Sequence, residues 1–272
     1  EYLMLQGGQF SKSRKHAVWL PSFLEKYDAD SLRYYLSINM PETHDTDFRW
    51  DEFVDRVNNE LIGTYGNFVH RVMTLTHRLV DSDSNPLSPY DHTDSHSKII
   101  EDCRIKMESA ISSMERQRFK EALRSIMGIA QIGNVLLQNA APWKYISSEE
   151  SEDRQESLSA LAMAWRLCRT LSILTRPFMP FQSERLWSML GETGDIDSIL
   201  WDNSLDTNCE LHWNPENPQP LFSRLDLDEI IADEKSIVED SNDNDPKHDP
   251  KDGAGYIAVS YTHLTLPTNR EV

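Results

Sequence analysis

The chain has 272 residues, 39% of them hydrophobic, and a formal net charge of −18. This length and composition allow one large globular domain, or a domain with flanking segments. The sequence has no apolar run long enough to cross a bilayer, and it does not open on a charged-then-apolar leader, so we expect neither a membrane anchor nor a signal peptide.

Such a negative total charge argues against nucleic-acid binding, but the charge is uneven. Residues 225–252 hold eleven Asp or Glu against three Lys, whereas residues 98–124 hold seven Lys or Arg against five acids. A protein that binds a loop of RNA needs a local positive face, not a positive total. The net charge therefore weakens an RNA-binding interpretation without excluding it.

The three cysteines, Cys103, Cys168 and Cys209, lie far apart and none belongs to a C-x-x-C pair. This pattern predicts neither a zinc site nor a disulfide framework. We expect buried, reduced thiols in a cytoplasmic protein. The histidines are scattered, so no metal site is assigned.

The first segments read as a loop and a helix. Gly7-Gly8 and the following QFSKSRKH mark a mobile loop. Residues 21–38 are predicted to be helical, because Pro21 suits a first turn and apolar residues then recur at helical spacing. Residues 40–50 are polar and are expected to form a connector.

Two long helices are predicted next. Asp51 is the expected N-cap of a helix that runs to about Val80 with one continuous apolar stripe. Residues 81–97 are a predicted loop. Residues 98–139 give a second helical pattern, with Gly128 and Gly133 as candidate break points, and Pro142 ends or kinks it.

A third helix follows the acidic patch 147–156, whose charges suit a helix N-terminus. Its predicted buried face holds Leu158, Leu161, Trp165, Cys168, Leu171 and Leu174. RPFMPF (176–181) is expected to bend the chain, and residues 183–190 to form a short helix closed by Gly191. Residues 192–222 look irregular, and residues 225–252 are predicted to be a linker or a disordered tail.

The sharpest local signal is the loop Phe10-Ser11-Lys12-Ser13-Arg14. A lysine gives phosphate a point charge, and hydroxyls and backbone N–H groups donate to phosphate oxygens. A solvated Ser/Lys turn is the alternative, and the motif alone would favour it. The residues that follow the loop favour the phosphate-binding interpretation.

The loop resembles the KMSKS signature of class I aminoacyl-tRNA synthetases, with Gln9 and Phe10 in place of its first two residues. The continuation resembles methionyl-tRNA synthetases of archaeal type, with a D-x-L-R-Y-Y-L core at residues 30–36 and an acidic D-x-D-F turn at residues 45–48. The resemblance covers residues 1 to about 231 and is most specific over 3–80. Since Glu1 reads as the middle of a domain, we infer a C-terminal fragment of a longer protein.

The resemblance implies a mainly α fold, in which an antiparallel helix bundle of the class Ia anticodon-binding type follows the C-terminal end of a Rossmann-type catalytic core. It divides the chain into four segments. Residues 1–50 would end the catalytic core, residues 51–224 would form the anticodon-binding domain, residues 225–258 an acidic linker or disordered tail, and residues 259–272 a non-native tail. The last segment looks like a translated sequencing adaptor, with a genuine tail of β propensity as the alternative.

The implied activity is that of a methionine–tRNA ligase, which activates methionine with ATP and transfers it to tRNA. Lys12 is the implied catalytic residue, and Ser11, Lys12 and Ser13 are the implied ATP-binding residues, with Mg²⁺ accompanying the ATP. We find no H-I-G-H-type motif, methionine pocket or zinc-knuckle cysteines in the sequence. The chain alone is therefore expected not to form adenylate.

The anticodon contacts implied by the family are Asn67, Arg71 and Trp143. Asn67 and Arg71 are four residues apart and share a helix face, where an amide and a planar guanidinium can contact the edge of one base. Trp143 follows Pro142 and would stack on the first base of the CAU anticodon of tRNA(Met). By spacing alone, a surface pair and a buried core tryptophan would be favoured.

Two other interpretations stay open at this stage. The chain could be a free-standing helical module that binds a tRNA anticodon without catalysis, although the FSKSR loop argues against it. It could also be a purely structural bundle, in which Trp143 would be buried. Four residues of the RPFMPF…LW region are expected to be core and bend residues rather than ligands: Pro177, Phe178, Phe181 and Trp187.

Overall fold

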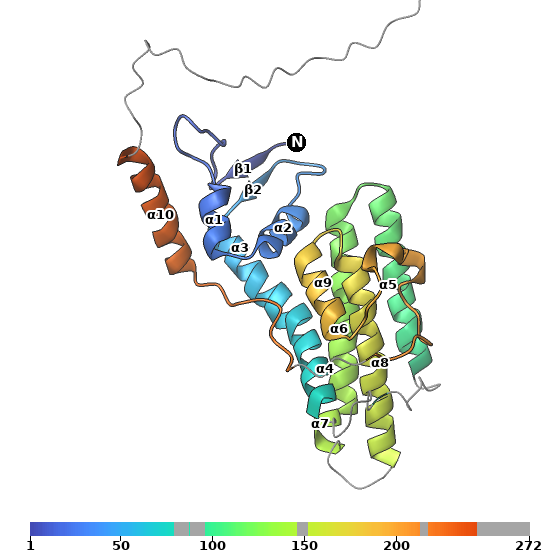
Figure 1. Cartoon of the computed structure of the whole chain (residues 1–272). Coiled ribbons are helices and arrows are strands. Elements are labelled where there is room, and N and C mark those ends of the chain that lie inside the picture. Colours follow the sequence, from blue (N-terminus) through green and yellow to red (C-terminus); the bar gives the residue numbers. More distant parts are fainter. Residues whose placement is uncertain (79–86, 88–95, 146–151, 213–216, 244–272) are drawn as a thin grey trace, which may run out of the picture.

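The computed structural model of the chain describes residues 1–78, 87, 96–145, 152–212 and 217–243, with side chains as far as residue 235. A small parallel sheet with short helices forms one end of this part, and a bundle of long helices forms the other (Figure 1). The predicted mainly α fold is confirmed. The predicted tail at 259–272 and most of the predicted loop at 81–97 lie outside the described residues.

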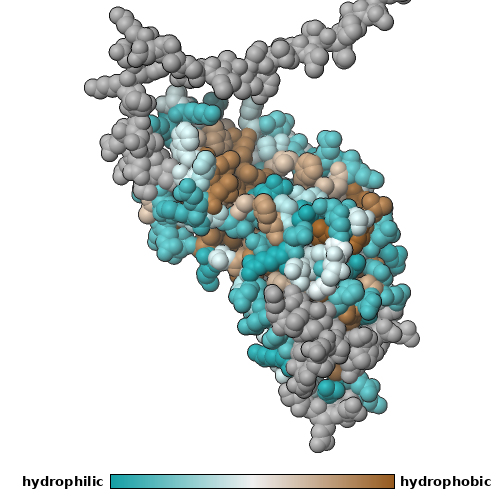
Figure 2. Space-filling view, viewed as in Figure 1, coloured by the Kyte–Doolittle hydropathy of each residue, from teal (hydrophilic) through white to brown (hydrophobic). Residues whose placement is uncertain are grey.

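The sheet joins two short strands that lie far apart in the sequence. Strand β1 (Leu3–Leu5) runs parallel to β2 (Thr46–Phe48), with Leu3 opposite Thr46. The predicted connector at 40–50 therefore contains a strand. Apolar side chains gather over this end of the molecule in the view of Figure 2, and six large ones among the first forty residues are exposed: Tyr2, Phe10, Leu20, Leu24, Leu36 and Met40.

Two helices lie between the strands, where one was predicted. Helices α1 (Leu20–Lys26) and α2 (Ala29–Ile38) are separated by an extended step at Tyr27 and Asp28. The Asp28 side chain accepts a hydrogen bond from the Ser31 N–H at 2.8 Å. It therefore caps a new helix, which a prediction based on apolar spacing cannot see.

The predicted long helix is present, with a change of type inside it. Helix α3 (Trp50–Arg56) continues directly into the π-helical segment η1 (Val57–Gly66) and then α4 (Asn67–Arg78). The predicted N-cap is wrong, since Asp51 lies within the first turn and pairs with Arg49 at 2.8 Å. A Cβ at Gly66 would lie 2.8 Å from the Leu61 carbonyl oxygen, so the wide π turn favours glycine there.

The second long pattern is a helical hairpin. Helix α5 (Ser97–Glu115) turns at residues 116–118 into α6 (Phe119–Ala140), and Gln117 takes a left-handed φ of 58° in the turn. The break predicted near Gly128 or Gly133 is therefore wrong. The stop at Pro142 is confirmed, since Ala141 has a φ of 42° and α7 (Pro142–Tyr145) starts a new turn.

The third helix, α8 (Glu152–Thr175), lies at the centre of the bundle, and its predicted apolar face is buried. Helix α9 (Pro180–Met189) follows, and Gly191 has the left-handed φ of 76° expected after a helix end. Phe178 and Trp187 are buried as expected. Phe181 is not, because its side chain is 64% exposed.

Beyond the bundle, two short 3₁₀ turns, η3 (Ile196–Ser198) and η4 (Trp201–Asn203), precede helix α10 (Leu227–Asp243). The expectation of a disordered tail is therefore wrong over α10. The helix lies against α3, where Ile230 is fully buried. Asp233 accepts hydrogen bonds from Lys26, the last residue of α1, and from Tyr27, which follows it, both at 2.5 Å. These contacts stabilise a segment whose composition alone predicts disorder.

No helix among the residues described here is long and apolar enough to cross a membrane.

Candidate functional site

The loop that carries Lys12 is a short hairpin. Ser11 and His16 exchange backbone hydrogen bonds of 2.8 and 2.9 Å, and the Lys15 N–H donates to the Lys12 carbonyl at 3.0 Å. Lys12, Ser13 and Arg14 are exposed at its tip. The Ser11 hydroxyl lies 3.3 Å from that of Ser13 and accepts from the Arg14 N–H at 3.4 Å. The tip therefore presents an ammonium group, a guanidinium group and two hydroxyls within a few residues.

The base of this hairpin is held by residues for which the sequence analysis predicted no such role. The Gly7 N–H donates to both carboxylate oxygens of Asp47, at 3.0 and 2.9 Å. The His16 Nε2 lies 2.7 Å from the Leu5 carbonyl oxygen. The D-x-D-F turn, which the sequence shows only as a family feature, thus connects strand β2 to the start of the loop. Its spacing alone gave no sign of this contact.

The three predicted anticodon residues lie on one side of the bundle end. Asn67 and Arg71 are on α4, with Asn67 exposed and Arg71 half-buried. Trp143 is on α7, with its side chain 41% exposed. The Arg71 guanidinium carbon lies 5.0 Å from the centroid of the Trp143 ring. The purely structural interpretation required a buried Trp143, so the structure argues against it.

Asn67 has a neighbour that the sequence analysis missed. Its Nδ2 donates to the Oδ1 of Asn134 on α6 at 3.3 Å. Asn134 in turn donates through its own Nδ2 to the Thr64 carbonyl at 2.9 Å and to the Ala130 carbonyl at 3.2 Å. An asparagine directly after Gly133, in a mostly apolar stretch of α6, was the available signal.

The local charge of this surface suits RNA. Helix α4 carries His70, Arg71, His77 and Arg78 and no acidic residue, and α7 carries Lys144 and no acidic residue. Basic side chains beside an exposed aromatic ring are features that bind single-stranded nucleic acid. Helices α4 and α7 carry basic side chains and no acidic ones, whereas Glu152 and Asp153 open the neighbouring helix α8.

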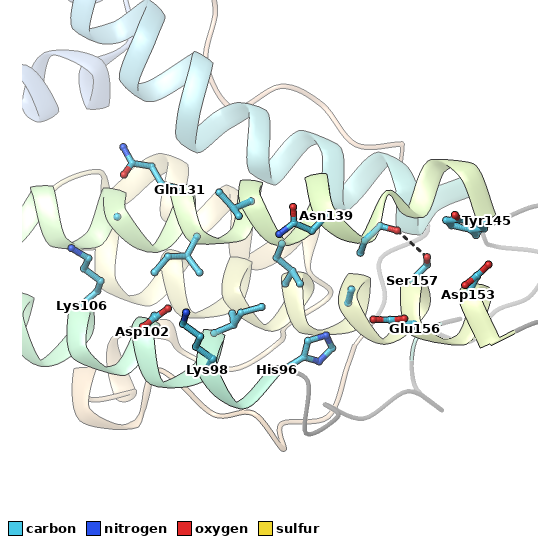
Figure 3. Close-up of a pocket in the computed structure, with 17 residues that line it drawn as sticks. His96, Lys98, Asp102, Lys106, Gln131, Asn139, Tyr145, Asp153, Glu156 and Ser157 are labelled. Carbon is cyan, nitrogen blue, oxygen red and sulfur yellow. Dashed lines mark hydrogen bonds between the residues drawn. The ribbon is translucent and has the colours of Figure 1, made fainter.

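A separate cavity of about 710 Å³ lies along α5, α6 and the start of α8 (Figure 3). Its labelled side chains include two lysines and three carboxylates, and Ser157 donates to the Ala140 carbonyl at 3.0 Å at one end. Asn67, Arg71 and Trp143 do not line it. The three residues therefore lie outside this cavity.

The cysteines have no catalytic environment. Cys103 and Cys168 are buried, and burial raises the pKa of the Cys103 thiol to about 12 and that of Cys168 well above its usual value. Cys209 is half-buried, and its pKa is raised by the same cause. A reactive cysteine needs a lowered pKa. Within the described part of the chain, no group of three or more His, Cys, Asp or Glu could hold a metal ion.

The two ends of the molecule are joined by α2 and the start of α9. The buried Asp30 carboxylate accepts from the Gln182 N–H at 2.7 Å, and Arg33 donates to the Phe178 and Pro177 carbonyls, both at 3.0 Å. Burial raises the pKa of Asp30 to about 6. The D-x-L-R-Y-Y-L core thus attaches the sheet end of the chain to the bundle.

Two family models match the chain and assign it to a class of proteins. The family model for class I tRNA synthetases (M) matches residues 1–73. The model for the anticodon-binding domain of methionyl-tRNA ligase matches residues 89–228, which is more than half of the chain. The chain therefore belongs to the methionyl-tRNA ligase family.

Curated relatives agree with this family. The methionine–tRNA ligase of Methanopyrus kandleri is 31% identical over 249 residues, which are 92% of this chain and 36% of that protein. That of Aeropyrum pernix is 38% identical over 242 residues, 89% of this chain and 41% of that protein. The chain thus spans about two fifths of the length of these relatives.

Solved structures agree on the fold. The apo form of methionyl-tRNA synthetase from Mycobacterium tuberculosis superposes with a TM-score of 0.69 at 20% identity, over 83% of this chain and 42% of that one. The same enzyme bound to methionyl-adenylate gives a TM-score of 0.71 at 20% identity, over 81% and 43% of the two chains.

Proposed function

We propose that the chain is the part of a methionine–tRNA ligase that carries the lysine of the ATP loop and the anticodon-reading residues. The single observation that carries this proposal is the group formed by the exposed Asn67 and Trp143 and the half-buried Arg71, in which the guanidinium carbon lies 5.0 Å from the centre of the indole. A ring for stacking and two hydrogen-bonding side chains beside it are the means by which proteins read an unstacked base.

In the proposed reaction, the methionine carboxylate attacks the α-phosphorus of ATP, forming methionyl-adenylate and releasing pyrophosphate. A ribose hydroxyl at the 3′ end of tRNA(Met) then attacks the adenylate carbonyl and displaces AMP. Lys12 would act in the first step, since a fixed cation stabilises the negative charge that builds on the phosphate oxygens. Ser11 and Ser13 would donate hydrogen bonds to the same phosphates, with Mg²⁺ bound to the ATP.

The proposed role of residues 1–50 is to end the catalytic core, while residues 51–224 form the anticodon-binding domain. The two parallel strands β1 and β2 support this division, since parallel strands occur almost entirely in sheets covered on both faces. The exposed apolar side chains around them also suit a surface that packs against further protein. Reduced, partnerless cysteines agree with a cytoplasmic enzyme.

The decisive experiment measures binding of the chain to an anticodon stem-loop with CAU and to one with UAU, at a fixed salt concentration because phosphate contacts depend on salt. The proposal expects tighter binding of CAU and a large loss with Trp143→Ala. Equal affinity of a folded protein for both stem-loops, or no loss with Trp143→Ala, would refute the proposed reader.

A further inference from the structure

We infer that Asn134 is a positioning residue that fixes which way the Asn67 amide faces, and that it thereby determines the preference of this surface for cytosine over uracil. The inference rests on the proposed anticodon-reading function. It adds a residue that does not touch the RNA and acts only through another side chain.

The first step is the orientation of Asn134 itself. Its Nδ2 lies 2.9 Å from the Thr64 carbonyl oxygen and 3.2 Å from the Ala130 carbonyl oxygen. A carbonyl oxygen can only accept a hydrogen bond. If the amide were turned over, its own oxygen would face both carbonyls and neither contact could form. The backbone therefore sets the amide of Asn134 in one orientation.

The second step is the effect of the fixed Asn134 amide on the orientation of the Asn67 amide. With its Nδ2 committed to two carbonyls, Asn134 presents its Oδ1 to the neighbouring helix, where the Asn67 Nδ2 donates to it at 3.3 Å. Since that oxygen can only accept, Asn67 must turn its amino group inward. Its own Oδ1 then faces away from Asn134, on the exposed side of α4 where Arg71 and Trp143 lie.

The close approach of α6 and α4 makes this chain of contacts possible. Residue 133, directly before Asn134, is a glycine, and a Cβ there would lie 2.3 Å from the Cζ of Phe68, directly after Asn67. The Phe68 ring therefore packs directly on the backbone of Gly133, with no second side chain between the two helices. A short side chain such as Asn134 can therefore reach both its own helix and the Thr64 carbonyl in η1.

The third step concerns the base. The Watson–Crick edge of cytosine offers an amino donor beside two acceptors, whereas that of uracil has an oxygen where cytosine has the amino group. An outward acceptor on Asn67 and a donor on Arg71 complement cytosine. With uracil, two acceptors would face each other and the site would keep an unpaired polar group, which costs binding energy. An Asn67 amide free to turn over would serve either base.

The test compares stem-loops with CAU and UAU on five forms of the full chain: wild type, Asn134→Ala, Asn67→Asp, the double variant Asn67→Asp with Asn134→Ala, and Gln131→Ala. Gln131 is an exposed amide side chain one turn before Asn134 on α6, and it serves as the matched control. Asn67→Asp presents an acceptor in every orientation, so its outward acceptor no longer depends on Asn134, but its inward oxygen then faces the Asn134 Oδ1 with no proton between them.

We expect Asn134→Ala to lower the CAU-over-UAU preference about tenfold, the effect of one hydrogen bond, and Gln131→Ala to leave it unchanged. In the Asn67→Asp background, Asn134→Ala should not lower the preference, because it removes only the oxygen that faces the carboxylate, and the added negative charge weakens binding of both RNAs. A purely structural role of Asn134 would lower the preference in both backgrounds. That result, or an unchanged preference in Asn134→Ala, would overturn the inference while leaving the proposed function intact. Equal binding of CAU and UAU by the wild type would overturn both.

A measurement on the wild type avoids any dependence on the folding of variants. Both side-chain amide protons of Asn134 should exchange with solvent much more slowly than those of Gln131 in nuclear magnetic resonance spectra, because both donate to carbonyls. Exchange at equal rates would show that the amide is not fixed and would overturn the inference without any RNA.

Discussion

Arg71 covers the ring of Trp143, with its guanidinium carbon 5.0 Å from the ring centroid, and so joins helix α4 to the short helix after Pro142. A guanidinium at this distance from an indole is attracted by the ring, by roughly 0.5–1 kcal/mol at an exposed site. The contact restrains both side chains before any RNA arrives. It also leaves the indole 41% exposed, enough surface for a base to stack.

Trp143→Ala should weaken binding of a CAU stem-loop by roughly 1–3 kcal/mol, or about 5- to 150-fold, because the stacking surface is lost. Trp143→Phe should retain part of the affinity. Phe181→Ala is the matched control, since Phe181 is a 64% exposed aromatic residue on another helix. A filter-binding or fluorescence titration measures all three. Equal losses for Trp143→Ala and Phe181→Ala would show a general effect of surface aromatic residues.

Lys12→Ala should slow adenylate formation about 100- to 1000-fold, the usual effect of losing one fixed group that stabilises transition-state charge. The assay is ATP–pyrophosphate exchange in an enzyme that contains this chain together with the rest of its catalytic core. Arg14→Ala, which removes a second charge from the same exposed hairpin tip, is the control. If both variants lose the same activity, the loop acts through its total charge and Lys12 has no particular role.

Helix positions were predictable where apolar spacing carries the signal. The buried face of α8, the stop at Pro142 and the turn at Gly191 follow from local patterns. The division between α1 and α2 was not predictable, because it depends on a single N-cap contact of Asp28. Helix α10 was not predictable either. The burial of Ile230 and the hydrogen bonds of Asp233 with Lys26 and Tyr27 stabilise this helix, and these hydrogen bonds join residues far apart in the sequence.

The predicted anticodon residues came from family resemblance, since a polar pair at helical spacing is common on any surface. The sequence could not show which of these residues contact one another in space. The contact of Arg71 with Trp143 depends on the packing of the bundle, and so does the hydrogen bond between Asn67 and Asn134. A mobile loop was predicted here from Gly7-Gly8 and the Ser/Lys cluster, but its hairpin form was not. Its anchoring by Asp47 joins residues that only strand pairing brings together.

Asp30 should make the stability of the chain depend on pH. Burial raises its pKa from 3.8 to about 6, so between these values the folded state holds a proton that the unfolded state has lost. The contribution of Asp30 to the free energy of unfolding should therefore fall as pH rises from about 4 to about 6, by about 3 kcal/mol, and be level above that range.

Asp30→Asn should remove the Asp30 part of the fall and leave that of Glu234, because the amide does not ionise and its oxygen can still accept from the Gln182 N–H. Urea unfolding at several pH values measures the difference between the two proteins. Glu234, whose pKa is raised by burial to about 7, titrates higher, and Glu234→Gln is the control. Parallel pH profiles of wild type and Asp30→Asn would contradict the assignment.

Gly133→Ala should destabilise the bundle although alanine favours helices, because a Cβ at this position would lie 2.3 Å from Cζ of Phe68. Both residues are buried, so α4 and α6 must move apart, at a cost of about 1–3 kcal/mol. Gly194→Ala is the matched control, since a Cβ there meets nothing within 4 Å. Thermal unfolding should show a lower Tm for Gly133→Ala and little change for Gly194→Ala.

Phe68→Leu removes the ring that clashes, so the double variant Gly133→Ala with Phe68→Leu should recover part of the loss in Tm. A separation of these helices would also stretch the contact of Asn134 with Thr64, so Gly133→Ala should weaken the CAU preference even where the protein remains folded. An unchanged Tm would mean that the two helices are not in the close contact on which the positioning of Asn67 depends.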